Sequence, residues 1–261
     1  MDWSALQVSL LLAALTALVL LPLGLGLARW LAVTAWAGRP LVEALLLLPL
    51  LLPPTVMGFY FLVALGQGSL LGAWLASHWG VRLVFSLQGL LLVSVLVNLP
   101  FMVQPIQRAF AAVPHSLREA AWVSGLSGWQ TFWRVELPLA WPGLLAGTAL
   151  TVAHTLGEFG VVLMVGGNIP GETRTLPLAL YTALQTPDGD AMAARLALVS
   201  FLLGLAGLLL FDQAFELQPG HFQLVFQRGY AFLLAHVRCL GGADAAGAVG
   251  AGGGDGELRF M

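Results

Sequence analysis

The chain has 261 residues, of which 59% are hydrophobic and only 9% are charged, and its formal net charge is −2. A water-soluble domain carries about a quarter of its residues as Asp, Glu, Lys and Arg, so this composition excludes most soluble classes and indicates a lipid environment. All 11 basic residues are scattered arginines, which argues against a nucleic-acid-binding face. The single cysteine, Cys239, and the lack of any Cys/His spacing typical of zinc leave redox and metal chemistry without support.

Five stretches are long and apolar enough to cross a membrane, which takes about 20 residues in a helix. They predict an all-α polytopic membrane protein with spans at 4–28, 41–65, 84–110, 139–165 and 191–211. The alternative for the first stretch is a signal peptide, but it opens with Asp2 instead of a basic residue and lacks a cleavage site. A sixth element at 174–186 is too short to cross and contains Pro177, so a re-entrant or interfacial helix is expected there.

The arginines of the short loops predict the orientation, because cytoplasmic loops carry more positive charge. Five arginines lie in or beside the first and third loops: Arg29, Arg39, Arg108, Arg118 and Arg134. Three lie in or beside the second and fourth loops: Arg82, Arg174 and Arg195. The first and third loops are therefore predicted to be cytoplasmic. With five spans, the N-terminus lies outside and the C-terminus inside.

Two of the predicted spans contain more than one proline. Pro49, Pro53 and Pro54 lie in the second span, and Pro100 and Pro105 lie in the third. Each removes a helix hydrogen bond and tends to kink the segment, so these helices could enclose a path. The alternative is that the prolines only shape helix packing, which membrane helices tolerate.

The third loop, between the third and fourth spans, predicts two short helices that project into the cytosol. Ser116 and Glu119 have the spacing of a capping box that starts a helix, and Gly125 can take the left-handed conformation that ends it. A second short segment follows, and Pro138 fits the first turn of the next span. Small residues beside aromatic ones suit a helix that lies in the groove of another protein, but the same composition suits a loop resting on lipid headgroups.

The spacing within this loop resembles the EAA loop of the membrane subunits of ABC importers. The matching pattern is Glu119, Ala120 and Ala121, then Gly125, then Val135, Leu137 and Pro138, with Val135 where the family usually has Ile. The resemblance implies the ABC importer permease fold and a coupling helix that sits in a cleft of a cytoplasmic ATPase. It also implies that the first four of these residues carry the coupling, while Leu137 and Pro138 set the return to the membrane.

A carboxylate lies within the fourth apolar stretch, at Glu158. Burying a charge there costs at least about 2.5 to 3.5 kcal/mol on insertion scales, so a compensating group is expected. His154 is one turn earlier on the same face, with Thr155 beside it, which predicts a His–Glu pair or a hydrogen bond inside the bundle. Glu158 could equally gate a path.

Two further motifs resemble the branch of this family that imports oxyanions, molybdate permeases in particular. They are Leu-Gly-Glu-Phe-Gly at 156–160 and Asn-Ile-Pro-Gly-Glu-Thr-Arg-Thr-Leu-Pro at 168–177. The resemblance covers about residues 4–213 and implies the membrane subunit of an importer for molybdate, with sulfate or tungstate as the alternative solute. Sulfate permeases share both motifs, so they are less specific to the anion than to the branch.

The resemblance also implies the partners. Two copies of the chain would pair around a central path in the bacterial inner membrane, two cytoplasmic ATPases would bind the coupling loops, and a periplasmic protein would deliver the anion. The sequence has no G-x-x-x-x-G-K-[ST] loop, so ATP and Mg²⁺ are expected in the partner and no cofactor in this chain, which is not expected to be an enzyme.

A path for a doubly charged anion should offer dipoles that bind weakly, so that the anion can leave. The candidates are a set of polar or small residues of the third and fourth spans together with one proline and one carboxylate: Asn98, Pro100, Thr151, Thr155, Gly157, Glu158 and Gly160. Glycines and threonines at such positions also serve as close-packing residues between helices, and that alternative stays open.

The last part of the chain, 214–261, differs in composition from the permease region at 1–213. Alternation on both sides of Pro219-Gly220 predicts a β-hairpin over 214–226, and the Gly/Ala-rich 241–256 is typical of disorder. The hypothesis is a cytoplasmic domain that is cut short or shifted in reading frame; the alternative is an added tail without function.

Two other classes compete with transport. A membrane scaffold could recruit a cytoplasmic ATPase and move no solute. An intramembrane enzyme is the weaker competitor, since His154 and Glu158 have no third catalytic group, and His78 and His115 are predicted to lie in loops.

Overall fold

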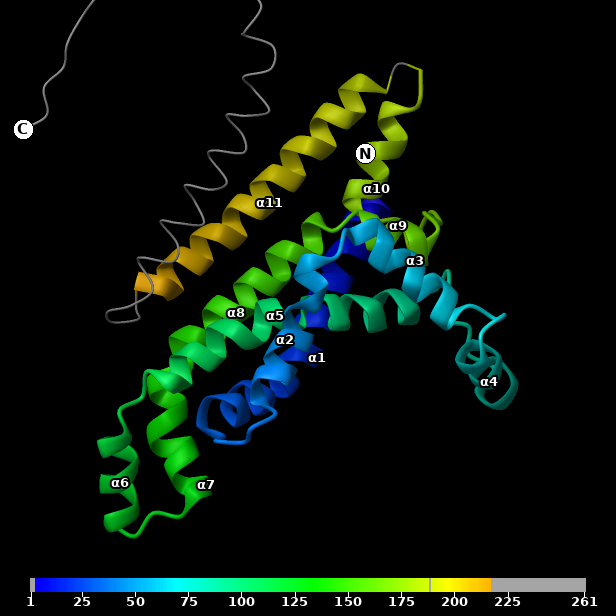
Figure 1. The fold of residues 1–261 in the computed structure, drawn as a ribbon. Coiled ribbons are helices and arrows are strands. Elements are labelled where there is room, and N and C mark those ends of the chain that lie inside the picture. The colour runs from blue at the N-terminus through cyan, green and yellow to red at the C-terminus, as the bar shows by residue number, and fades with distance from the viewer. Residues whose placement is uncertain (1–2, 188, 217–261) are drawn as a thin grey trace, which may run out of the picture. The chain divides into compact units, whose positions relative to one another are not determined.

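The computed structural model describes residues 3–187 and 189–216, and these contain helices and loops without a strand. Figure 1 shows long helices side by side, with two short helices, α6 and α7, at one end and α9 and α10 at the other. The elements in chain order are α1 (Trp3–Val33), α2 (Arg39–Leu51), α3 (Pro54–Leu65), α4 (Leu70–Trp79), α5 (Leu87–Ala111), α6 (His115–Val123), α7 (Gly128–Thr131), the π-helix η1 (Phe132–Glu136), α8 (Leu137–Gly157), α9 (Gly160–Gly166), α10 (Leu176–Leu184) and α11 (Asp190–Glu216).

Four helices within the described residues are long and apolar enough to cross a membrane, and a bent pair makes up to five. They are α1, α5, the continuous run α7–η1–α8 and the first part of α11, while α2 and α3 form the pair with a bend of 108°. The predicted all-α membrane fold is therefore confirmed. Two spans need correction: 41–65 is broken in the middle, and 139–165 is divided between α8 and the separate helix α9.

The break between α2 and α3 follows from consecutive prolines. Leu52 and Pro53 have extended backbone, with ψ angles of 138° and 133°, and Pro54 opens α3. A residue before proline is pushed out of the helical region, and proline cannot donate the hydrogen bond that would continue the helix. In α5 the chain remains helical through Pro100 and Pro105, so those prolines do not divide the span.

The core forms where α1 and α8 pack against α5. A Cβ placed on Gly24 of α1 would lie 2.5 Å from Met102 Cγ, and one on Gly147 of α8 would lie 2.8 Å from the Met102 carbonyl oxygen. Small residues therefore let the three backbones approach closely, as is typical of helix interfaces in membranes.

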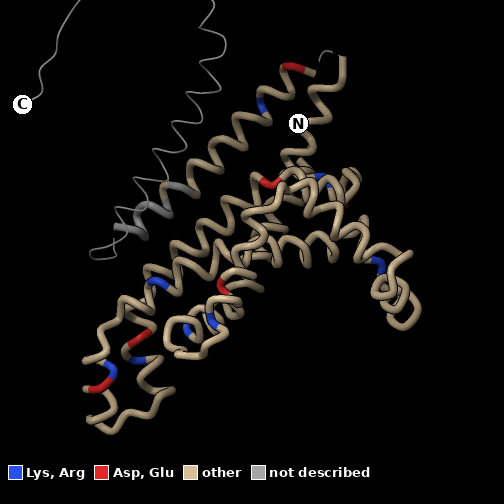
Figure 2. The backbone as a smooth tube through the Cα atoms, viewed as in Figure 1, with Lys and Arg blue, Asp and Glu red and all other residues tan. Residues whose placement is uncertain are grey.

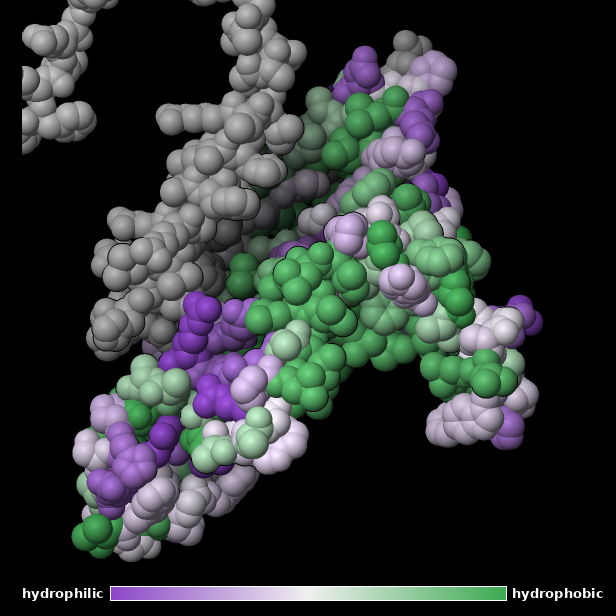
Figure 3. All heavy atoms as spheres, viewed as in Figure 1, coloured by the Kyte–Doolittle hydropathy of each residue, from purple (hydrophilic) through white to green (hydrophobic). Residues whose placement is uncertain are grey.

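Charged residues lie mainly near the ends of the helices, with many near α6 and α7 (Figure 2). Hydrophobic residues cover the middle of the visible face, and hydrophilic residues gather over the α6–α7 end (Figure 3). Exposed apolar side chains on α1, α2 and α3 include Leu18, Leu45 and Phe59, with exposed fractions of 69%, 60% and 51%. This distribution suits a protein whose lateral surface meets lipid.

Three local predictions have mixed outcomes. The short helix predicted at 174–186 is present as α10, whereas α4 was not anticipated. His78 lies in α4 and His115 begins α6, so the prediction that both lie in loops is wrong. α11 stays helical through Glu216, so the predicted β-hairpin cannot begin at 214–216, and its remainder, 217–226, lies outside the described residues, as do 241–256.

Candidate functional site

The two short helices and the π-helix form a helical hairpin, residues 115–136, at one end of the bundle (Figure 1). In α6, Ala121 is buried, while Glu119 and Ala120 are exposed. Large apolar side chains are exposed around them, including Val123 at 89% and Trp129 at 69%. Exposed aromatic and aliphatic groups beside a small Ala make a face that can lie in the groove of a partner.

The turn of the helical hairpin is built on Gly125, as predicted. Gly125 has a φ of +82°, its N–H donates to the Trp122 carbonyl oxygen at 2.9 Å, and the Leu126 N–H donates to the Ala121 carbonyl oxygen at 3.0 Å. These two bonds form a Schellman motif, in which a left-handed residue after the helix satisfies its last carbonyls. A Cβ at Gly125 would meet no atom within 4 Å, so the conformation, and not space, favours glycine.

The predicted capping box of Ser116 and Glu119 is wrong. Pro114 is the N-cap of α6, and no side chain forms a capping hydrogen bond there. The Glu119 carboxylate instead lies 3.1 Å from the ring of His115, one turn earlier. A reciprocal capping box does occur at the start of α7. There the Ser127 hydroxyl accepts from the Gln130 N–H at 3.3 Å, and the Gln130 side chain accepts from the Ser127 N–H at 2.9 Å.

The return of the helical hairpin to the membrane contains the residues at the end of the EAA-like pattern. Val135 and Leu137 are half-buried, and Pro138 lies in the first turn of α8 as predicted. Between them, Glu136 is 2% exposed and lies 2.6 Å from Arg29 and 2.9 Å from Arg118. This buried carboxylate was missed in the sequence because its partner on α1 is 107 residues away.

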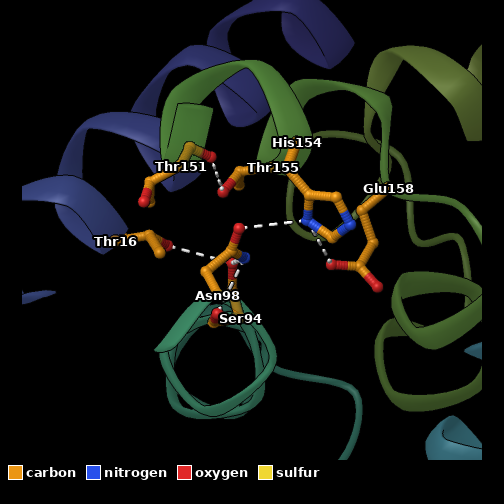
Figure 4. A network of polar contacts seen from close by, with 7 residues as sticks. All are labelled: Thr16, Ser94, Asn98, Thr151, His154, Thr155 and Glu158. Carbon is orange, nitrogen blue, oxygen red and sulfur yellow. Dashed lines mark hydrogen bonds and ion pairs between the residues drawn. The ribbon is translucent and has the colours of Figure 1, made fainter. Parts of the chain in front are cut away.

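A second set of functional candidates meets inside the bundle, where polar side chains of α1, α5 and α8 face one another (Figure 4). This polar cluster comprises Thr16, Ser94, Asn98, Thr151, His154, Thr155 and Glu158. The Asn98 amide donates to the Ser94 carbonyl oxygen at 2.8 Å, and its carbonyl oxygen lies 3.0 Å from His154 Nδ1. Thr16 extends the chain to α1 by donating to the Ser94 hydroxyl at 3.0 Å.

His154 is the centre of the polar cluster. Its ring stacks on Phe101 with 4.0 Å between the ring centroids, and its Nδ1 lies 3.9 Å from Glu158 Oε2. The expected proximity of His154 and Glu158 is confirmed, but Asn98 is the nearer partner of the ring. The cluster therefore joins α5 to α8 mainly through a hydrogen bond between an amide and an imidazole.

A cavity of about 470 Å³ opens beside the polar cluster. Its walls come from the start of α3 and the break between α8 and α9: Pro54, Thr55, Ala153, His154, Gly157, Glu158, Phe159 and Gly160. Asn98, Thr151 and Thr155 are buried and do not line it, and the Thr151 hydroxyl has no hydrogen-bond partner among the described residues. A hydroxyl of this kind can be satisfied by water or by a solute.

The residues predicted to line the path lie in three places: the polar cluster, the cavity beside it, and a separate cavity. Asn98, Thr151, Thr155 and Glu158 belong to the polar cluster, and Gly157 and Gly160 line the adjacent cavity. Pro100 is elsewhere: it lines a different cavity, of about 300 Å³, together with Arg39, Glu43, Gln104, Gln107 and Arg108.

The two glycines of this group differ in their surroundings. A Cβ on Gly160 would lie 2.9 Å from Pro54 Cβ and 3.2 Å from the Thr55 nitrogen, so Gly160 allows α9 to approach α3 closely. A Cβ on Gly157 would meet nothing within 4 Å. The packing interpretation therefore fits Gly160, whereas Gly157 has open space on the cavity side.

The loop between α9 and α10, residues 167–175, is held by hydrogen bonds of its own polar side chains. Asn168 has a φ of 58° and its side chain carbonyl accepts from Arg174 Nε at 2.9 Å, while its amide donates to Thr182 of α10 at 3.0 Å. Thr173 is fully buried and donates to the Gly166 carbonyl oxygen at 2.6 Å. This motif thereby fixes the position of α10 relative to α9.

Comparison with known proteins places this geometry in a family. The family model described as "Binding-protein-dependent transport system inner membrane component" matches residues 20–214, which include the helical hairpin and the polar cluster. The chain belongs to this family. Members are transport components of the inner membrane, so this is a multi-pass inner membrane protein.

Two relatives within this family are permeases for inorganic anions. The molybdenum transport system permease protein ModB of Escherichia coli K12 is 39% identical over 209 residues, which are 80% of this chain and 91% of that relative. The sulfate transport system permease protein CysW of Synechocystis sp. PCC 6803 is 34% identical over 225 residues, which are 85% of this chain and 79% of that relative.

The fold also matches solved structures. A crystal structure of a bacterial ABC transporter for import of the polysaccharide alginate superposes with a TM-score of 0.67 at 18% identity, covering 82% of this chain and 78% of that one. A second structure of an alginate transporter, in complex with a periplasmic protein that holds an alginate pentasaccharide, gives a TM-score of 0.63 at 18% identity, covering 81% and 76%. The family member described here therefore has the fold of an ABC importer permease.

Proposed function

We propose that this chain is the membrane subunit of an ABC importer, that it forms the translocation path for molybdate, and that a separate subunit hydrolyses the ATP. The observation that carries the proposal is the identity of 39% to a molybdenum permease over 91% of that relative. The chain itself is proposed to bind no cofactor and to catalyse no reaction.

The assembly contains two copies of the chain, two cytoplasmic ATPases and a periplasmic protein that delivers the anion. The N-terminus lies outside and the helical hairpin lies in the cytoplasm, in agreement with the excess of arginines near that end. Support for a periplasmic partner comes from the alginate importer that was solved with such a protein. Support for the ATPase contact comes from the exposed apolar face around Glu119, Ala120 and Val123.

Transport then requires that motion of the helical hairpin changes the contacts between α5 and α8. The hairpin is continuous with α8 through η1, so movement at the docking face is passed along one helix toward the polar cluster. Separation of the two helices at that level breaks the contact between Asn98 and His154 and opens the buried Asn98 side of the cluster to the cavity that His154 and Glu158 line. Alternating access of this kind is typical of transporters that move one helical unit against another.

The polar cluster suits a weakly held anion. It offers an amide, hydroxyls and an imidazole, which are dipoles that can replace part of a hydration shell without a fixed positive charge. A carboxylate at Glu158 would repel the anion, so we assign to Glu158 the role of partner to His154 and not of ligand.

Sulfate import is the second candidate, because the Synechocystis sulfate permease is 34% identical over 79% of its length. Tungstate is a further alternative, as an anion of the same shape and charge as molybdate. A scaffold that recruits the ATPase without moving a solute would keep the helical hairpin and dispense with the polar cluster.

Uptake into vesicles separates these candidates. The chain is reconstituted with its ATPase and a binding protein, and accumulation of labelled molybdate, tungstate and sulfate is measured with ATP or with ADP. We expect accumulation of molybdate that depends on ATP. ATP-driven accumulation of sulfate alone would replace the solute, and ATP hydrolysis with no accumulation of any of the three would favour the scaffold.

A further inference from the structure

Glu136 lies at the junction of the helical hairpin and the membrane helices. Glu136 is 2% exposed; its carboxylate accepts a hydrogen bond from Arg29 Nε of α1 at 2.6 Å and forms an ion pair with Arg118 Nε of α6 at 2.9 Å, a contact that lacks hydrogen-bond geometry. A carboxylate is rarely buried without a partner, and here each of its oxygens faces a different guanidinium. We call these three residues the Glu136 cluster.

Arg118 connects the Glu136 cluster to a third helix. Its Nη2 donates to the Phe110 carbonyl oxygen, in the last turn of α5, at 2.9 Å. The same carbonyl also accepts from the Val113 N–H at 3.3 Å, so the Arg118 bond is a second one at the end of α5, and it attaches α6 to that helix. The side chain of Arg118 is only 12% exposed, so both of its interactions are shielded from water.

Arg29 adds a contact on the other side. Its guanidinium lies 5.0 Å from the centre of the Phe132 ring, within the distance of a cation–π interaction. Phe132 is 7% exposed and stacks on Phe110 of α5 with 6.2 Å between the centroids. α1, α5, α6 and η1 are thus joined through one buried carboxylate and its two arginines.

The π-helical turn places Glu136 in this position. η1 spans Phe132–Glu136, and its first and last residues are both buried while Trp133 and Arg134 between them are exposed. A π-turn inserts extra backbone into a helix and often occurs at functional sites. Here it turns a carboxylate inward at the point where α7 continues into α8.

We infer that Arg118, Glu136 and Arg29 are positioning residues that fasten α6 to α1 and α5, so that displacement of the helical hairpin by the ATPase moves the membrane helices. Between Ala111 and His115 only a short loop joins α6 to α5, and the Glu136 cluster is what holds α6 across that loop. The inference rests on the proposed function, since it requires an ATPase at the hairpin.

Loss of the carboxylate should uncouple hydrolysis from transport. Glu136→Gln keeps the shape of the side chain but leaves two cations facing each other at the base of the hairpin. The docking face is unchanged, so the variant should still bind the ATPase and hydrolyse ATP. The molybdate imported per ATP hydrolysed should fall at least about fivefold, the lower end of typical coupling between sites.

The measurement is made on the reconstituted complex, with uptake, hydrolysis and ATPase co-purification determined in one preparation. Glu136→Asp keeps the charge and should recover part of the ratio. Arg134→Gln is the matched control, because it removes a cation from an exposed position of the same turn, and its ratio should equal that of the parent chain.

Arg118→Gln provides a second test at the hairpin side of the same contact. It should lower the ratio as Glu136→Gln does, and the double variant should be no worse than the single ones, because the two residues act as one unit. An unchanged ratio in both variants would overturn the inference. This holds also where uptake and hydrolysis fall in equal proportion, because the ratio is then unchanged. Failure of both variants to accumulate in the membrane would overturn the inference as well, since it assigns the cluster to folding alone.

The proposed function fails in a different way. If the parent chain imports no molybdate, the function is wrong whatever the variants do. If the parent imports it and the ratio does not respond to Glu136, only the inference is wrong.

Discussion

The base of the helical hairpin and the polar cluster both bury polar groups between helices, but they do so with different chemistry. The Glu136 cluster uses full charges at 2.6 and 2.9 Å and a guanidinium bond to the end of α5. The polar cluster relies mainly on amide, hydroxyl and imidazole groups, with His154 and Asn98 at 3.0 Å and the nearest carboxylate contact at 3.9 Å.

The difference indicates where the molecule resists motion and where it permits it. Removing one partner of a fully buried ion pair typically costs about 3 to 5 kcal/mol, whereas a hydrogen bond between membrane helices averages about 0.6 kcal/mol. The side chain of Arg29 is 35% exposed, so the contact between Glu136 and Arg118, at 3% and 12%, is the one closest to the buried case. A stiff joint near the docking face and a weak contact near the cavity are what transmission of a movement to an opening path requires. The following variants test that contrast.

Among the variants outside the Glu136 cluster, the largest effect on stability is expected where α8 touches α5, because this packing supports both regions. Gly147→Val would place its Cβ about 2.8 Å from the Met102 carbonyl oxygen, a backbone atom that cannot move aside. We expect a loss of about 1 to 3 kcal/mol in the free energy of unfolding, measured by thermal unfolding in detergent. Gly26→Val is the control, since a Cβ on Gly26 meets no atom within 4 Å. Equal losses would show that the close approach at Met102 is not what holds the helices.

At the tip of the helical hairpin, Gly125→Asp tests the docking face apart from its base. A residue with a Cβ at a φ of +82° costs roughly 1 to 2 kcal/mol, and the new carboxylate adds charge beside the exposed apolar groups. Insertion should be unchanged, and ATPase affinity should fall by about tenfold. Gly128→Asp carries the same charge at the first residue of α7, where no positive φ is needed. It should weaken binding less; unchanged co-purification with Gly125→Asp would refute the docking assignment.

In the polar cluster, Asn98→Leu should have a moderate effect on stability and a clear effect on uptake. It removes the bond to His154 and the bond to the Ser94 carbonyl oxygen, for a loss of about 0.6 to 1.7 kcal/mol in thermal unfolding. Molybdate uptake should fall more than ATPase binding, which should remain. Thr148→Val is the comparison, because the Thr148 hydroxyl bonds to the Leu144 carbonyl oxygen within α8 and makes only a long contact, 4.0 Å, with Met102 Sδ of α5. If both variants transport equally, Asn98 does not belong to the path.

The smallest effect is expected on the exposed face of α6. His115 and Glu119 lie 3.1 Å apart, but their side chains are 69% and 60% exposed, so water screens the pair. His115→Gln should change the free energy of unfolding by at most about 0.5 kcal/mol. A larger loss would mean that polar contacts on the face of the hairpin, and not only the ion pairs at its base, hold α6 in place.

Local features of the fold could be predicted because they depend on neighbouring residues. Long apolar stretches gave the spans, and Gly125 marked the end of α6 because few other residues adopt its φ of +82°. The Ser116–Glu119 cap was wrong for a local reason as well. Pro114 is extended, with a ψ of 136°, so the helix starts directly after it and His115 attracts the Glu119 carboxylate.

Contacts between distant segments could not be predicted from these patterns. The turn at Leu52 and Pro53 was visible as a proline cluster, but not its angle of 108°. His154 was expected to meet Glu158 on its own helix, yet its nearest partner is Asn98, 56 residues earlier. Glu136 had no local signal, since Arg29 and Arg118 meet it only when α1 and α6 are folded together.

Docking of the ATPase on this chain requires that the helical hairpin lie in the cytoplasm. The variant Val123→Cys is made in a chain that also carries Cys239→Ser, so that it holds a single cysteine at a position that is 89% exposed in the parent. Vesicles of each orientation are then treated with a membrane-impermeant maleimide. We expect labelling of inside-out vesicles only, and slower labelling once the ATPase is bound. Labelling of right-side-out vesicles would contradict the account, because the hairpin would then face away from any source of ATP.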